Sequence, residues 1–143
     1  MGLSFEAAKQ IHSLIQRDEP ESRIFAANAL LYTNGHKEKC QSVETADDIL
    51  RNVLRYELDT DNYLVAATLC WGTELFDYRP RSVKLIWNAM QKHPQVLIFG
   101  SGSQGKSYSA IAFGLLDWER DPEGVGIACG LCFPFSFYFV AAK

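Results

Sequence analysis

The sequence predicts an α/β fold, in which a mostly helical N-terminal region leads into a strand, a glycine-rich loop and a helix. Three consecutive features predict the second part. The run Val96–Phe99 is apolar and as short as a buried strand, residues 100–107 form a glycine-rich loop, and residues 108–118 have the composition of a helix. We expect the helical region to span residues 1–92 and a partial α/β core to span residues 93–143.

Apolar residues at helical spacing predict the N-terminal helices. The predicted runs are Phe5 to Ile15, Ile24 to Leu30, Ile49 to Leu58, and a short fourth helix that ends at Leu69. Asn34-Gly35 is expected to end the second run. Thr45 with Asp48 three residues later resembles a capping arrangement for the third run, and Asp61 or Asn62 is a candidate cap for the fourth.

A fifth helix is predicted directly before the strand. Its apolar residues follow the i, i+3, i+4, i+7 pattern and are Val83, Ile86, Trp87 and Met90. Ser82 is the predicted N-cap, and His93-Pro94 ends the helix because the residue before a proline is pushed out of the helical region. Tyr78, Arg79 and Arg81 precede this pattern, where an arginine or an aromatic ring could stack on a nucleotide base. A solvated basic turn is the favoured interpretation.

Composition excludes several classes of protein. The chain has 143 residues, a net charge of −3 and ordinary globular proportions of apolar and charged residues, so it lacks the overall basic character of a protein that coats nucleic acid. The first residues do not have the order of a signal peptide, so we expect a cytoplasmic protein with reduced cysteines. Cys129 and Cys132 with His36 and Cys40 could form a zinc set, but small buried side chains are the favoured interpretation of this C-x-x-C.

The loop itself carries the chemistry. Gly100-Ser101-Gly102-Ser103-Gln104-Gly105-Lys106-Ser107 matches G-x-x-x-x-G-K-[ST], the phosphate-binding P-loop, and Tyr108 follows it. The glycines permit close approach of the main chain to phosphate oxygens, and the following helix adds its positive N-terminal end. Lys106 is the expected charge for the β- and γ-phosphates of ATP and Ser107 the expected ligand of Mg²⁺. The fold class is therefore the first strand, P-loop and helix of a P-loop NTPase core.

The same glycines also spell G-x-G-x-x-G, the dinucleotide-binding pattern. That pattern assigns no role to Lys106-Ser107, and it expects an acid at the end of a second apolar strand about 20 residues further on. The acids between Asp117 and Glu123 all precede the next apolar run. We therefore favour the binding of a nucleoside triphosphate.

A second acidic motif, which P-loop hydrolases use to hold Mg²⁺ and position water, is missing from the sequence. Asp117 and Glu119 follow the loop so closely that we place them at the exposed end of its helix. No acid follows Glu123, and residues 124–143 are almost entirely uncharged. This tail could form a buried strand pair, or it could be the product of a truncated or shifted reading frame. Because the core is then incomplete, we expect self-association through uncovered apolar faces.

A family resemblance adds to these inferences. The phrases Glu74–Asp77, Arg79–Trp87, Val96–Tyr108 and Leu115–Pro122 resemble the beginning of a phage terminase large subunit, over roughly residues 60–123. The resemblance implies an ATPase motor that drives double-stranded DNA into a capsid together with phage packaging proteins, in the cytoplasm of the host cell. It would make Lys106 the catalytic phosphate-binding lysine and Ser107 the Mg²⁺ ligand.

The leading expectation is ATP binding by part of such a packaging motor, with turnover left open. One alternative is a non-catalytic helical interaction module whose P-loop is incomplete. Another is a fragment of a different P-loop NTPase, such as a helicase or a kinase.

Overall fold

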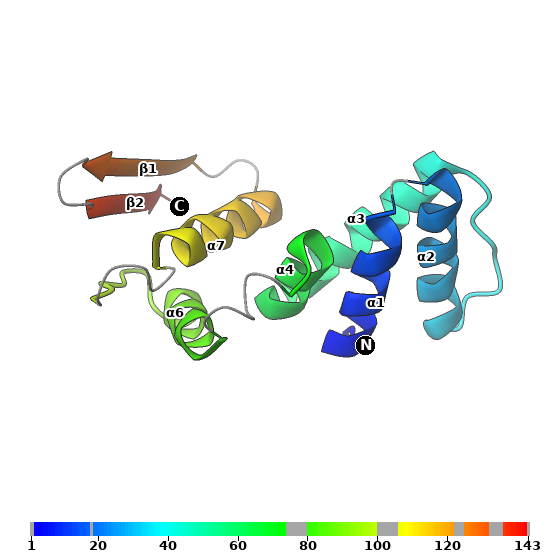
Figure 1. The fold of residues 1–143 in the computed structure, drawn as a ribbon, viewed down its shortest axis with the longest axis horizontal. Helices are drawn as coiled ribbons and strands as arrows, with labels where there is room; N and C mark the ends of the chain where they lie inside the picture. Colours follow the sequence, from blue (N-terminus) through cyan, green and yellow to red (C-terminus); the bar gives the residue numbers. More distant parts are fainter. Residues whose placement is uncertain are drawn as a thin grey trace. The chain divides into compact units, whose positions relative to one another are not determined.

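The computed structural model describes residues 2–17, 19–73, 80–99, 106–121, 125–131 and 136–142. The chain divides into two compact units, Met1–Gly72 and Thr73–Lys143 (Figure 1). The predicted boundary between residues 92 and 93 lies inside the second unit and stays a prediction.

The first unit consists of four helices: α1 (Phe5–Ile15), α2 (Pro20–Thr33), α3 (Val43–Asp59) and α4 (Tyr63–Trp71). Helix α1 packs on α2 and α4, and α3 packs on α2 and α4. These helices were predicted from apolar spacing, and their existence is confirmed. Their shared core is built by the buried side chains Ala8, Ile11, Ala26, Leu30, Val65 and Leu69.

The ends of these helices have identifiable causes. Helix α3 is capped by Ser42, whose Oγ accepts a hydrogen bond from the main-chain N–H of Thr45 at 3.2 Å, so the prediction that Thr45 is the cap was wrong. Ser42 has the extended backbone that an N-cap needs, whereas Thr45 is already inside the helix. After α2 the chain turns at Gly35, where φ is +76°, as the Asn34-Gly35 signal predicted.

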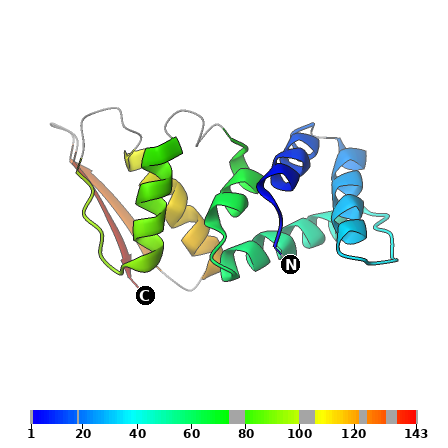
Figure 2. The ribbon, with the colours of Figure 1, turned by 90° about the horizontal axis from the view of Figure 1, so that it is seen from below.

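The second unit contains α6 (Pro80–Lys92), α7 (Lys106–Arg120) and a hairpin of β1 (Val125–Leu131) and β2 (Ser136–Ala142). Helices α6 and α7 pack against each other, and both strands of the hairpin contact α7 (Figure 2). The strands are antiparallel, with Val125 opposite Ala142 and Leu131 opposite Ser136. Helix α6 begins at Pro80, so Ser82 lies in its first turn and is not the predicted cap.

The predicted α/β fold class was wrong. Between residues 2 and 121, every regular element that the structure describes is a helix, and Val96–Phe99 is not a strand. A strand needs a neighbour to bond its main-chain N–H and C=O groups. The two strands of the tail pair with each other and not with residues 96–99, so the described residues build no parallel sheet in front of the loop.

None of the helices that the structure describes combines the length and the apolar character that crossing a membrane requires.

Candidate functional site

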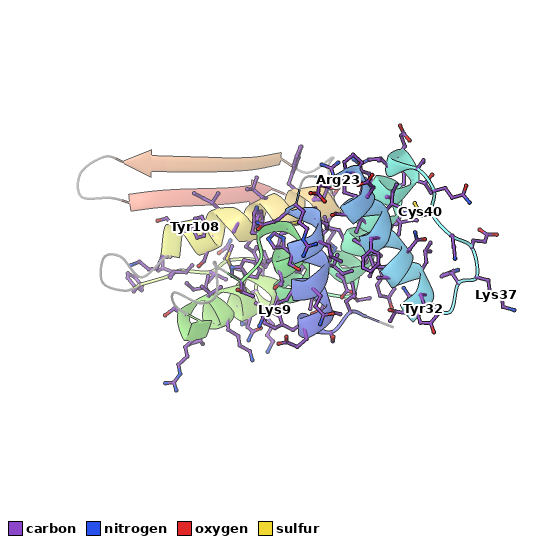
Figure 3. All side chains as sticks on the ribbon, turned by 45° about the vertical axis from the view of Figure 1, so that its right-hand side comes forward. Lys9, Arg23, Tyr32, Lys37, Cys40 and Tyr108 are labelled. Atoms are coloured by element: carbon purple, nitrogen blue, oxygen red, sulfur yellow. The ribbon has the colours of Figure 1, made fainter. Side chains whose placement is uncertain are left out.

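The predicted site lies at the start of α7. Lys106 is the first residue of this helix and Ser107 the second, and both side chains are half-buried. Tyr108 belongs to the same turn and is 61 % exposed (Figure 3). Gly100, Ser101, Gly102, Ser103, Gln104 and Gly105 lie outside the described residues. A helix begins where the motif requires one, and it begins at the lysine of the motif.

The first turn of α7 is fixed to α6 by a buried hydrogen bond. The indole Nε1–H of Trp87 donates to the main-chain carbonyl oxygen of Ser109 at 3.0 Å. Trp87 is fully buried and meets the ring of Phe113 edge to face, with 5.8 Å between the ring centroids. One side chain of α6 therefore holds two successive turns of α7. The orientation of the helix N-terminus depends on that contact.

Ser109 is a residue of this site that the sequence analysis missed. Ser109 is fully buried, and its Oγ has no hydrogen-bond partner among the described residues. It shares a helix face with Ala112, Phe113 and Leu116, all of which are buried. A serine in line with three apolar residues at helical spacing is the signal that could have placed it in the interface with α6.

The acidic side chains of α7 lie at its other end. Asp117 is eleven residues beyond Lys106, which corresponds to about 16 Å along the helix axis at a rise of about 1.5 Å per residue. We expected Asp117 and Glu119 to be exposed, but both side chains are half-buried. No group of three or more metal-binding side chains exists in the part of the chain that the structure describes. The acids of α7 are thus remote from Ser107 along the helix.

The basic residues before the loop lie on α6. Arg81 and Lys84 are both exposed there. Tyr78 and Arg79 lie outside the described residues, so base stacking by this segment stays a prediction.

Cys40, a member of the zinc set that the sequence analysis considered and did not favour, has a structural role. Cys40 is buried, its Sγ lies 3.2 Å from the carbonyl oxygen of Ser42, and its main-chain N–H donates to Asn28 Oδ1 at 2.7 Å. These contacts fix the connection between α2 and α3. His36 is exposed, while the side chains of Cys129 and Cys132 lie outside the description.

The first unit contains a pocket of about 520 Å³ between α2 and α3. Leu30, Leu31, Ile49 and Val53 contribute apolar surface, and Glu57 contributes a carboxylate. That carboxylate is almost completely buried and accepts hydrogen bonds from the main-chain N–H of Leu3 and from Asn62 Nδ2, each at 2.6 Å. A volume of this size is typical of sites that hold small ligands or side chains of a partner.

Comparison with protein-family models, with curated proteins and with solved structures gives no match to this chain.

Proposed function

We propose that the chain binds the phosphates of ATP, or of another nucleoside triphosphate, through residues 100–107. The observation that carries the proposal is the start of α7 at Lys106, directly after the glycine-rich segment. The first main-chain N–H groups of a helix have no partner within the helix, and the helix dipole adds partial positive charge at the same place. Phosphate oxygens are the natural acceptors for such a group of donors.

The side chains add charge and a metal ligand to these donors. Lys106 supplies a cation for the β- and γ-phosphates, and Ser107 supplies a hydroxyl oxygen on the first turn. Bound Mg²⁺ would neutralise phosphate charge and would take most of its ligands from phosphates and water, with the Ser107 hydroxyl as one ligand from this turn. Trp87 keeps this first turn in place through the carbonyl oxygen of Ser109.

Titration calorimetry with Mg·ATP tests the proposal. The wild type should bind, and Lys106→Ala should weaken binding at least about tenfold, since it removes a charge-assisted hydrogen bond to phosphate. Lys84→Ala is the matched control, because Lys84 is an exposed lysine on α6 and should bind as the wild type does. Equal affinities of the wild type and Lys106→Ala would overturn the assignment of the loop.

We further propose that this binding serves a DNA-packaging motor, as the resemblance of residues 60–123 to phage terminase large subunits implies. The acids of α7 itself are far from Ser107 along the helix, so we assign nucleotide binding and leave hydrolysis to the test. A phosphate-release assay with and without double-stranded DNA distinguishes a packaging motor from another P-loop NTPase. DNA-stimulated release that Lys106→Ala abolishes would support a motor, and release without any effect of DNA would favour another P-loop NTPase.

A second candidate function is a helical interaction module. The first unit supports it, because its four helices enclose their own core and carry the pocket beside Glu57. If the chain is such a module, it should release no phosphate from ATP, and Lys106→Ala should leave its binding to a partner unchanged. The calorimetry above therefore distinguishes it from nucleotide binding.

A further inference from the structure

Helix α7 has two apolar faces. One face is buried and carries Ala112, Phe113 and Leu116. The second face carries Tyr108, Ile111, Leu115 and Trp118, which are 61, 39, 53 and 53 % exposed. A helix that is apolar on two sides is normally covered on both. Here α6 supplies Trp87 to the first face, and the side chains of the second face remain 39–61 % exposed although both strands of the hairpin also contact α7.

The open face has the spacing of a coiled-coil seam. Its four residues stand at intervals of three, four and three, so they form one stripe along the helix. The exposed part of the four side chains amounts to roughly 400 Å² of largely apolar surface, which is as large as the largest patch on a typical monomer. Two such faces in contact would remove about 800 Å² from water, the size of a small, weak interface.

We infer that this stripe is the interface between two copies of the chain, with the two α7 helices antiparallel. The stripe is self-complementary in that orientation. Tyr108 of one copy faces Trp118 of the other, Ile111 faces Leu115, and both pairs are centred on the turn of Phe113. An isologous contact of this kind closes on itself and yields a dimer.

Charge favours the antiparallel orientation over the parallel one. Helix α7 begins with Lys106, and its last turn with the residue after it carries Asp117, Glu119, Arg120 and Asp121, so its N-terminal end is basic and its C-terminal end has a net negative charge. The helix dipole has the same polarity. An antiparallel pair places each basic end beside the acidic end of the other copy, whereas a parallel pair places like charges together.

The pairing has a consequence for the phosphate site, and this part of the inference rests on the proposed function. In an antiparallel coiled coil, Ser107 and Asp121 occupy flanking positions that face each other across the two copies. Asp121 is exposed and directly follows α7. The second copy would then place its Asp121 carboxylate beside Ser107. Within one chain, Asp121 lies at the opposite end of α7 from Ser107. Mg²⁺ bound by phosphates commonly uses one or two carboxylates as well.

Light scattering over a concentration series tests the interface without any nucleotide. The wild type should be a dimer, and Leu115→Glu should raise the dissociation constant at least about tenfold, because it places a charge in the seam of both copies. Asn88→Glu is the matched control, since it adds the same charge at an exposed position of α6 and should leave the dimer intact. Circular dichroism establishes that the variants remain folded. A monomeric wild type, or a dimer that Leu115→Glu does not weaken, overturns the inference.

Complementation tests the orientation. Tyr108→Lys and Trp118→Glu should each be monomeric alone, and an equimolar mixture should form a heterodimer. In the antiparallel pair the new lysine faces the new glutamate, and the native tyrosine faces the native tryptophan. A parallel pair has no such match, so a mixture that stays monomeric overturns the antiparallel assignment.

A second mixture tests the contribution of Asp121. Lys106→Ala and Asp121→Asn should each bind Mg·ATP at least about tenfold more weakly than the wild type, and their mixture should regain one tight site per dimer. Asp121→Asn that binds as tightly as the wild type overturns this part alone. A wild-type dimer that binds no Mg·ATP contradicts the proposed function and the role of Asp121, while the light-scattering result for the interface stands.

Discussion

The indole nitrogen of Trp87 and the carbonyl oxygen of Ser109 lie 3.0 Å apart in a buried hydrogen bond between α6 and α7. Ser109 is three residues beyond Lys106, so this contact anchors the turn on which the predicted phosphate-binding side chains stand.

Replacement of Trp87 should loosen that turn. Trp87→Phe keeps most of the ring contact with Phe113 but removes the N–H donor, and it should lower the free energy of unfolding by about 1 kcal/mol. Trp87→Ala also leaves a cavity and should cost about 3–5 kcal/mol. Urea denaturation measures both. Leu85→Ala is the control, because Leu85 on the same helix is 71 % exposed and should change stability by less than about 0.5 kcal/mol. A Phe variant as unstable as the Ala variant would contradict the role given to the donor.

The cap of α3 offers a direct comparison between two neighbouring hydroxyl side chains. Ser42→Ala should cost about 1 kcal/mol, since the main-chain N–H of Thr45 loses the Oγ that accepts its hydrogen bond. Thr45→Ala keeps that bond and should cost less than half as much. Thermal unfolding of the two variants ranks them. A larger loss in Thr45→Ala would contradict the assignment of Ser42 as the N-cap.

Glu57 should be required for the stability of the first unit. Its two carboxylate oxygens accept hydrogen bonds from Leu3 and Asn62, which joins the N-terminus to the turn between α3 and α4. Glu57→Leu leaves two half-buried donors without an acceptor and should cost about 2–4 kcal/mol in urea denaturation. Glu44→Leu is the control, because Glu44 is exposed on the first turn of the same helix. Equal stabilities of the two variants would contradict this account.

Two glycines with positive φ should respond differently to alanine. Gly72 ends α4 with φ at +69°, and a Cβ there would lie 2.8 Å from the imidazole ring of His12. The Nδ1–H of that ring donates to the carbonyl oxygen of Leu69 at 2.9 Å, which holds the ring in place. Gly72→Ala should therefore cost about 2–3 kcal/mol, through strain and through displacement of His12.

Gly35→Ala is the matched comparison for Gly72. Gly35 has φ at +76° but open space around the position of a Cβ, so only the backbone strain of about 1 kcal/mol applies. Thermal unfolding compares the two variants. If Gly35→Ala is the more damaging of the two, the packing of His12 is described wrongly.

The sequence predicted the helices well and the sheet badly. The apolar spacing of Val83, Ile86 and Trp87 is a local signal, and these residues form the buried face of α6. Val96–Phe99 has the composition of a strand, but a strand also depends on partners elsewhere in the chain, which composition does not reveal. Leu97 and Phe99 are 80 and 85 % exposed, and the two strands that the structure describes pair with each other and not with this segment.

The candidate site could be predicted in part. The motif identified Lys106 and Ser107, and the structure starts a helix at Lys106. The roles of Trp87 and Ser109 could not be predicted, because the hydrogen bond joins residues 22 positions apart and depends on how α6 and α7 cross.

The most direct test of the phosphate-binding claim is a ¹H–¹⁵N NMR titration of the whole chain with Mg·ATP. The account predicts that the largest shifts occur in the main-chain amides from Gly100 to Ser109, and that Lys106→Ala abolishes them. Shifts confined to the pocket beside Glu57, or no shifts at millimolar Mg·ATP, would contradict it.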